Sequence, residues 1–148
     1  MLCTTLVKAE SAEQTACLKH VSTSWSAAAQ AAARTDCEFY AANLVTGGDA
    51  WLKYADEHVA TGFAKGKTEL RAGITGMYSR PEFKLEWYPE TAADHGSFVV
   101  TTGKSTRSWR LPDGTMRVIH SHYLTVWQRQ EDGRYLFTYD VGEDDPKL

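Results

Sequence analysis

The fold is decided by the stretch 116–141, which reads MRVIHSHYLTVWQRQEDGRYLFTYDV. β-Branched and aromatic residues dominate this stretch on both sides of Glu131-Asp-Gly133, a tripeptide that is typical of a tight turn. The pattern therefore predicts two strands, 116–130 and 134–141, that pair as a hairpin.

The residues before this stretch continue the strand pattern. Segment 97–109 is rich in Val, Thr and Ser, and Pro112-Asp-Gly114 separates it from the next strand, which predicts a second hairpin. Residues 83–88 add a further strand. The two long strands exceed the usual length of about 5 or 6 residues, so we expect them to bend at a bulge or at Gly103.

The first half of the chain is patterned for helices instead. Ser11-Ala-Glu-Gln14 and Thr35-Asp-Cys-Glu38 both read as capping boxes, each of which starts a helix. Gly47-Gly48 ends the second helix, and Pro81 prevents a later one from continuing. From these signals and from helical spacing of apolar residues, we expect helices at about 11–34, 35–45, 50–58 and 68–78.

The bulk composition is that of one globular domain spanning residues 1–148, with a mobile segment at 1–10 and a polar tail at 143–148. The chain has 43% hydrophobic and 24% charged residues and a net charge of -3, which disfavours disorder and nucleic acid as a partner. It contains no apolar run near the roughly 18 residues that cross a bilayer, so no membrane partner is expected.

The chain has three cysteines, Cys3, Cys17 and Cys37, and none of them forms a CxxC pair. An odd number without metal-ligand spacing favours free thiols over a disulfide or a metal role. The first ten residues also lack the pattern of a signal peptide. Both observations predict a cytoplasmic location.

Three stretches, taken in order and spacing, carry a family resemblance over about residues 36–145. They are Gly48-Asp-Ala-Trp-Leu-Lys-Tyr-Ala-Asp-Glu-His-Val59 with Lys65-Gly-Lys-Thr-Glu-Leu70, then Leu85-Glu-Trp-Tyr-Pro89 with Gly96-Ser-Phe-Val-Val-Thr-Thr-Gly103, and Tyr123-Leu-Thr-Val-Trp-Gln-Arg-Gln-Glu-Asp-Gly-Arg-Tyr135 with Asp140-Val-Gly142. The chain resembles the NTF2-like superfamily, in particular its SnoaL-like, DUF4440-type branch, which is also similar to ketosteroid isomerase.

The resemblance implies an α+β, cone-shaped NTF2-like fold, in which N-terminal helices pack on a strongly curved antiparallel sheet. The open end of the cone would admit a small apolar or aromatic molecule. The resemblance also implies a homodimer formed through the outer face of the sheet. Neither a cofactor nor a metal ion is expected.

Alternation along the strand 117–130 separates two faces. The resemblance points Ile119, Ser121, Tyr123, Thr125 and Trp127 into the cone and His120 and His122 outward. In the last strand Leu136, Thr138 and Asp140 would share the inward face. The predicted substrate-binding residues are Trp51, Tyr54, Trp87, Tyr123, Thr125, Trp127 and Thr138.

Asp140 is the first candidate for catalysis, because a carboxylate in an aromatic cavity acquires the raised pKa of a general acid or base. Tyr40 or Tyr54 would assist it. The alternative is that Asp140 only accepts hydrogen bonds and holds the core together. His122 is the third candidate, since a register error of one residue would turn it and His120 into the pocket.

Steroid isomerisation itself is disfavoured. That chemistry needs a carboxylate base and an acid pair of a tyrosine and a protonated aspartate. By the resemblance Tyr40 lies near the position of the tyrosine, but Thr125 stands at the position of the aspartate, and the base position falls near Gly62.

The sequence thus predicts a small-molecule pocket protein of the SnoaL-like type. Its reaction would be acid-base proton transfer on an apolar carbonyl compound, as in a cofactor-independent isomerase, cyclase or lyase. The alternatives are a non-catalytic domain that binds a small ligand and a dimeric association domain. Fold does not decide among them, because function depends on the site.

Overall fold

The computed structural model describes residues 9–147, which form four helices and five strands. Cys3 and most of the segment predicted to be mobile lie outside the described residues. In chain order the elements are α1 (Ala12–Leu18), α2 (Ala27–Thr46), α3 (Asp49–Tyr54), β1 (Ala55–Thr61), α4 (Gly66–Tyr78), β2 (Lys84–Asp94), β3 (Phe98–Arg110), β4 (Met116–Arg129) and β5 (Tyr135–Asp144).

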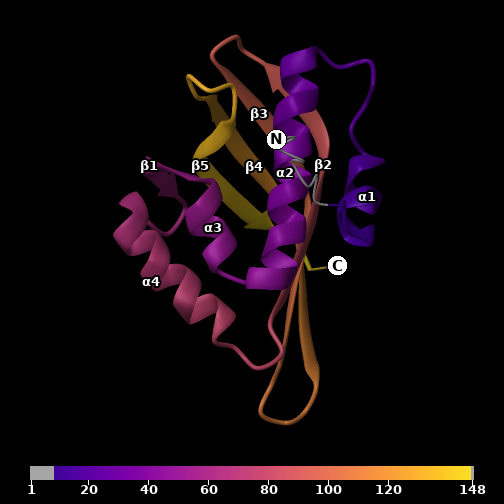
Figure 1. Ribbon diagram of the computed structural model, residues 1–148. Coiled ribbons are helices and arrows are strands. Elements are labelled where there is room, and N and C mark those ends of the chain that lie inside the picture. Colours follow the sequence, from indigo (N-terminus) through magenta and orange to yellow (C-terminus); the bar gives the residue numbers. More distant parts are fainter. Residues whose placement is uncertain (1–8, 148) are drawn as a thin grey trace, which may run out of the picture.

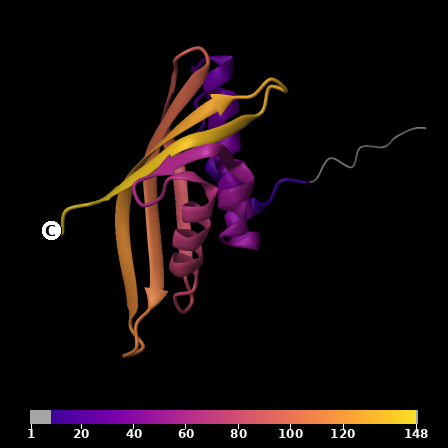
Figure 2. The same cartoon turned by 90° about the vertical axis from the view of Figure 1, so that its left-hand side faces the viewer.

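The strands form one sheet in the order β1-β5-β4-β3-β2, with the helices packed on one side of it (Figures 1 and 2). The predicted α+β class is therefore confirmed. Two details differ from the expectation. β1 runs parallel to β5, so the sheet is mixed, and the sheet is twisted without being strongly curled (Figure 2).

Both predicted hairpins are present, and Gly114 and Gly133 supply the positive φ angles of their turns. The β3–β4 hairpin projects beyond the helices (Figure 1). A bulge lies in β2, between Pro89 and Thr91 and opposite Gly103, whereas the two long strands that were expected to bend pair with each other in unbroken register. A Cβ atom at Gly103 would lie 2.0 Å from the carbonyl oxygen of Tyr88, so only glycine permits the two strands to approach this closely. β5 continues to Asp144, two residues into the predicted polar tail.

The predicted break before Thr35 is wrong, because α2 is one continuous helix. Its N-cap is Ser26, whose hydroxyl accepts the N–H of Ala29. Thr35 bonds back to the carbonyl of Ala31 as a residue of the helix interior. The predicted helix 11–34 is interrupted instead at residues 19–26. In the continuous helix, Asp36 lies on the buried face.

The predicted helix 50–58 ends early, since α3 stops at Tyr54 and Ala55 already has extended dihedral angles. Residues 55–58 belong to β1, which pairs with the edge of β5. The helical spacing of Trp51, Tyr54, Ala55 and His58 was therefore overridden by pairing with a strand 80 residues away, which local sequence does not encode.

A chain of polar contacts joins α4 to the other helices and to the edge of the sheet. The indole N–H of Trp51 donates to the hydroxyl of Tyr78, which donates to Asn43 in α2. The amide of Asn43 then donates to the carbonyl of Leu85 in β2. Helices α2, α3 and α4 are thus tied to one another and to the sheet edge.

A disulfide joins Cys17 in α1 to Cys37 in α2, with the two Cα atoms 5.6 Å apart. The prediction of free thiols is wrong for these two residues, because folding brings α1 and α2 side by side and sequence spacing does not show this. The disulfide also weakens the argument for a cytoplasmic location.

Among residues 9–147, no helix is long and apolar enough to cross a membrane.

We expect the double variant Cys17→Ser/Cys37→Ser to lose about 3 kcal/mol of unfolding free energy, because the bond closes a loop with a sequence separation of 20 residues. Urea denaturation measures the loss. Dithiothreitol should destabilise the wild-type protein by a similar amount and leave the double variant unchanged. Equal stability of the wild-type protein with and without the reductant would contradict the disulfide.

Candidate active site

A cavity of about 590 Å³ lies between α4 and the inner face of the sheet. Its walls are largely aromatic and aliphatic, and polar groups stand at both ends. Small residues of α4 create the space. Gly73 packs against the ring of Phe63, which a Cβ atom would meet at 2.6 Å, while a Cβ atom at Gly76 would meet nothing within 4 Å.

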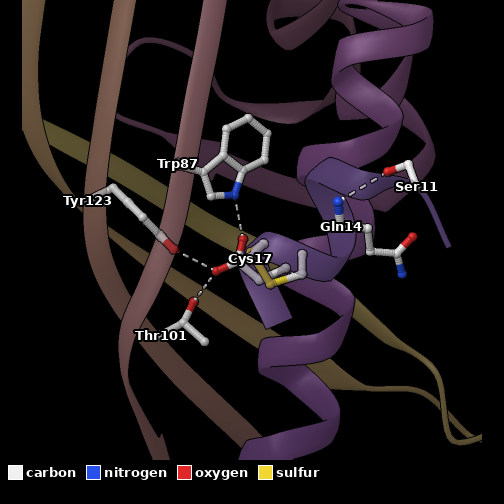
Figure 3. Close-up of a disulfide and its surroundings, with 8 residues drawn as sticks. Ser11, Gln14, Cys17, Trp87, Thr101 and Tyr123 are labelled. Atoms are coloured by element: carbon white, nitrogen blue, oxygen red, sulfur yellow. Dashed lines mark hydrogen bonds between the residues drawn. A yellow bond between two sulfur atoms is a disulfide. The ribbon is translucent and has the colours of Figure 1, made fainter. Parts of the chain in front are cut away.

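Asp36 lies at the deep end of the cavity and accepts three hydrogen bonds from the sheet. Its Oδ1 accepts the indole N–H of Trp87 at 2.8 Å, and its Oδ2 accepts the hydroxyls of Thr101 at 3.0 Å and Tyr123 at 2.8 Å. Figure 3 shows these three side chains pointing toward one carboxylate beside the disulfide. Burial raises the pKa of Asp36 to about 6, and the three donors limit the rise.

The Tyr123 hydroxyl keeps its proton at all ordinary pH values. Burial and the neighbouring Asp36 carboxylate raise the pKa of Tyr123 well above its usual value. Its O–H is directed at Asp36. Asp36 and Tyr123 therefore form a fixed pair in which both groups are already satisfied.

Asp140 has a different environment, because only one of its carboxyl oxygens is hydrogen-bonded. Oδ1 accepts the Thr125 hydroxyl at 2.6 Å, and the backbone carbonyl accepts the Gly62 N–H. Oδ2 has no partner among the described residues. Every fully buried side-chain oxygen in these residues has a partner, so Oδ2 is accessible, and Asp140 lines the cavity.

The pKa of Asp140 is raised to about 7, first by burial and then by the nearby Asp36 carboxylate, while the Thr125 hydrogen bond lowers it. Near neutral pH the carboxyl is therefore divided between its protonated and ionised forms. A group in this state accepts or donates a proton with little driving force in either direction, which is the property of a general acid-base.

Five of the predicted site residues are brought together. Trp51, Trp87, Tyr123 and Thr125 line the cavity with Asp140. Two others belong to the core. Trp127 is completely buried and donates its indole N–H to Thr101, and Tyr54 packs on the ring of Phe39.

The predicted inward face of the last strand is wrong for Leu136 and Thr138. Phe137 is the core residue there, with no exposed surface. The register between β4 and β5 shifts where Val126 pairs with Tyr139 and Trp127 with Phe137, so Thr138 is an extra residue in a bulge. The bulge reverses the alternation, and Asp140 returns to the inner face.

Tyr40 and His122 do not join Asp140. Both line another hollow of about 620 Å³, beside α1. The side chain of His122 is 60% exposed and contacts Asp145, so the register error that would turn it inward is absent. Among residues 9–147, no group of three or more His, Cys, Asp or Glu side chains is placed to hold a metal ion.

Asp36 is the site residue that sequence reasoning missed. A signal for it existed, because Ala29, Ala32, Ala33, Asp36, Tyr40 and Asn43 follow helical spacing along one buried face. A carboxylate inside such a stripe indicates a buried, hydrogen-bonded group. Assigning Asp36 to a capping box at a helix start concealed this pattern.

The raised pKa values predict an unusual pH dependence of stability. Both carboxyls have an ordinary pKa of about 4 when unfolded, but about 6 and about 7 when folded. Between these values the folded state binds more protons, so its unfolding free energy should increase as the pH falls from about 8 to about 5.

Asp140→Asn should remove part of this dependence and should be more stable than wild type at pH 8 by roughly 1–3 kcal/mol. Urea denaturation across this pH range measures both effects. Asp132→Asn, in an exposed turn, is the control and should keep the wild-type slope. Parallel curves for wild type and Asp140→Asn would contradict the raised pKa of Asp140.

Asp36→Ala should lower the unfolding free energy by roughly 3–5 kcal/mol, because it leaves the buried donors of Trp87, Thr101 and Tyr123 without their acceptor. Asp36→Asn retains one acceptor oxygen and should lose less. Chemical denaturation measures both variants, and a loss below about 1 kcal/mol in Asp36→Ala would show that the donors find other partners.

Comparisons with known proteins rest on structure. No protein-family model and no curated protein matches the sequence. A ketosteroid isomerase-like protein from Erwinia carotovora atroseptica is similar with a TM-score of 0.68 and 8% identity, over 83% of this chain and 100% of that one. An NTF2-like superfamily protein from Salmonella enterica serovar Typhimurium has a TM-score of 0.66 and 9% identity, over 82% and 93% of the two chains.

A conserved protein from Planctomyces limnophilus has a TM-score of 0.64 and 14% identity, over 78% of this chain and 95% of that one. The SnoaL-like, DUF4440-type branch stays a prediction. Because the sequence identities are 14% or lower, the similarity to these proteins shows the fold alone. The chain has the NTF2-like fold that ketosteroid isomerase-like proteins also have.

Proposed function

We propose that this chain binds a small apolar carbonyl compound in the cavity of α4 and the sheet, and that Asp140 transfers a proton at the carbon next to the carbonyl. The observation that carries the proposal is the unequal state of the two Asp140 oxygens. Thr125 fixes Oδ1, and Oδ2 is left accessible on the cavity wall.

In this proposal Asp36 and Asp140 have different roles. Asp36 is held by three donors and orients Tyr123, and its charge raises the pKa of Asp140. Ionised Asp140 accepts the α-proton on Oδ2, and the C–H electron pair moves into the enolate. Protonated Asp140 then returns the proton to a carbon of the same molecule, so the isomerisation balances without a cofactor.

The walls support an apolar substrate. Phe39 packs edge to face against both Trp51 and Trp87, and the three rings form an aromatic wall of the cavity. The reaction class is therefore proton transfer of the isomerase, cyclase or lyase type. Steroid isomerisation stays disfavoured, because Thr125 and Gly62 stand at two of the positions that it needs.

Non-catalytic binding is the second candidate, and the same cavity favours it, since binding needs the space without the acid-base group. The homodimer implied by the resemblance stays a prediction. For location, the disulfide between Cys17 and Cys37 supports an oxidising compartment better than the cytoplasm that free thiols had suggested.

Exchange of α-protons for deuterium tests the catalytic proposal. A panel of aryl ketones and cyclic enones is incubated with the protein in D₂O, and mass spectrometry measures deuterium uptake. We expect exchange with a subset of the panel, at a rate that rises from pH 6 to pH 8 as Asp140 ionises.

Asp140→Asn should slow this exchange at least about 100-fold, while the control Asp132→Asn should keep the wild-type rate. An unchanged rate in Asp140→Asn would remove this residue from the mechanism. Compounds that bind without exchanging their protons would favour the non-catalytic role.

A further inference from the structure

The cavity has a second polar end, which the proposed function does not use. Arg107 of β3 and Arg80, which follows α4, both line it. The Arg107 guanidinium lies 3.4 Å from the Ser121 hydroxyl. Ser121 precedes Thr125, the partner of Asp140, by four residues of β4, which is about 13 Å along a strand. Arg107 therefore stands well away from Asp140.

Arg80 is held over the same sheet face that carries Arg107. Its guanidinium carbon lies 4.3 Å from the centre of the Trp109 ring. Trp109 follows Arg107 by two residues in β3, so both side chains are on the same sheet face. Stacking on an indole orients the guanidinium plane and leaves its N–H groups available.

The charges at this end do not cancel. Arg107 donates to Asp144 at 2.9 Å, which neutralises one cation. Arg80 forms no salt bridge with any residue in the described range. Two guanidinium groups therefore share one carboxylate, and this end of the cavity carries a net positive charge.

We infer that the ligand of this cavity is an elongated apolar or aromatic keto acid, whose carboxylate is received by Arg80 and Arg107 while its carbonyl end lies at Asp140. The inference rests on the proposed function, since Asp140 places the carbonyl. A guanidinium matches the planar carboxylate with paired N–H donors. Between the two ends, Phe39, Trp51, Met77, Leu85 and Trp87 supply the apolar walls for the body of the molecule.

Matched pairs of probes test the inference. Each pair is a para-acetyl aryl carboxylic acid and its methyl ester, in a series with one, two and three rings to cover the length of the cavity. Calorimetry measures binding at low salt. We expect one member of the series to bind at least about tenfold more tightly as the acid than as the ester, a difference of about 1.4 kcal/mol. The preference should fall as salt is added.

Arg80→Gln should reduce the acid-to-ester preference to near unity and leave ester binding unchanged, and Arg107→Gln should act in the same direction. Arg110→Gln is the matched control, because Arg110 is a neighbouring exposed arginine that pairs with Glu82 and does not line the cavity. Gly76→Phe should block both acid and ester by filling open space.

The outcomes separate the two proposals. Acid and ester that bind equally and exchange their α-protons only with intact Asp140 would overturn the anionic end and keep the catalytic proposal. An Arg80-dependent preference for the acid, with exchange that ignores Asp140, would support the anionic end and reject the catalytic role. No preference for the acid at any length would overturn this inference.

Discussion

The three hydrogen bonds that the Asp36 carboxylate accepts are the interaction on which the rest of the structure depends. Their donors come from β2, β3 and β4, and the acceptor comes from the middle of α2. A buried carboxylate without donors would be costly, so α2 has one favourable position over the sheet. That position places the aromatic walls, and the Asp36 charge then raises the pKa of Asp140. The packing of the helix and the acidity of the site thus have one common origin.

The sequence predicted best those elements whose signal is local and periodic. The long strands and both glycine turns follow from alternation and turn chemistry, and the structure has them. The inward face of β4 follows from the family resemblance, because alternation separates two faces without saying which one is buried. Asp140 was placed on the correct face although the intervening bulge at Thr138 was not foreseen. The bulge reverses the alternation after Phe137, so Asp140 lies on the predicted face while Leu136 and Thr138 do not.

The sequence-based predictions are wrong where contacts with residues distant in the sequence determine the local structure. Residues 55–58 have helical spacing but pair with β5, and Cys17 meets Cys37 only after α1 folds back on α2. Asp36 was missed for a different reason. Its neighbours form a plausible capping box, and the same tetrapeptide sits without difficulty inside a long helix. The sequence is thus compatible with both a helix start and a helix interior at this position. The positions of Trp87, Thr101 and Tyr123, which donate to Asp36, show that the helix interior is correct.

The glycines of α4 have a consequence for how such a site diversifies. The acid-base groups belong to the sheet and α2, whereas the room beside them is set by residues of α4 that have little or no side chain. A substitution at Gly76 changes the shape of the space without touching Asp36, Asp140 or their partners. Selectivity and reactivity therefore reside on separate elements of the chain. A descendant of this protein could acquire a new substrate by single steps on one helix, while its proton chemistry stayed intact.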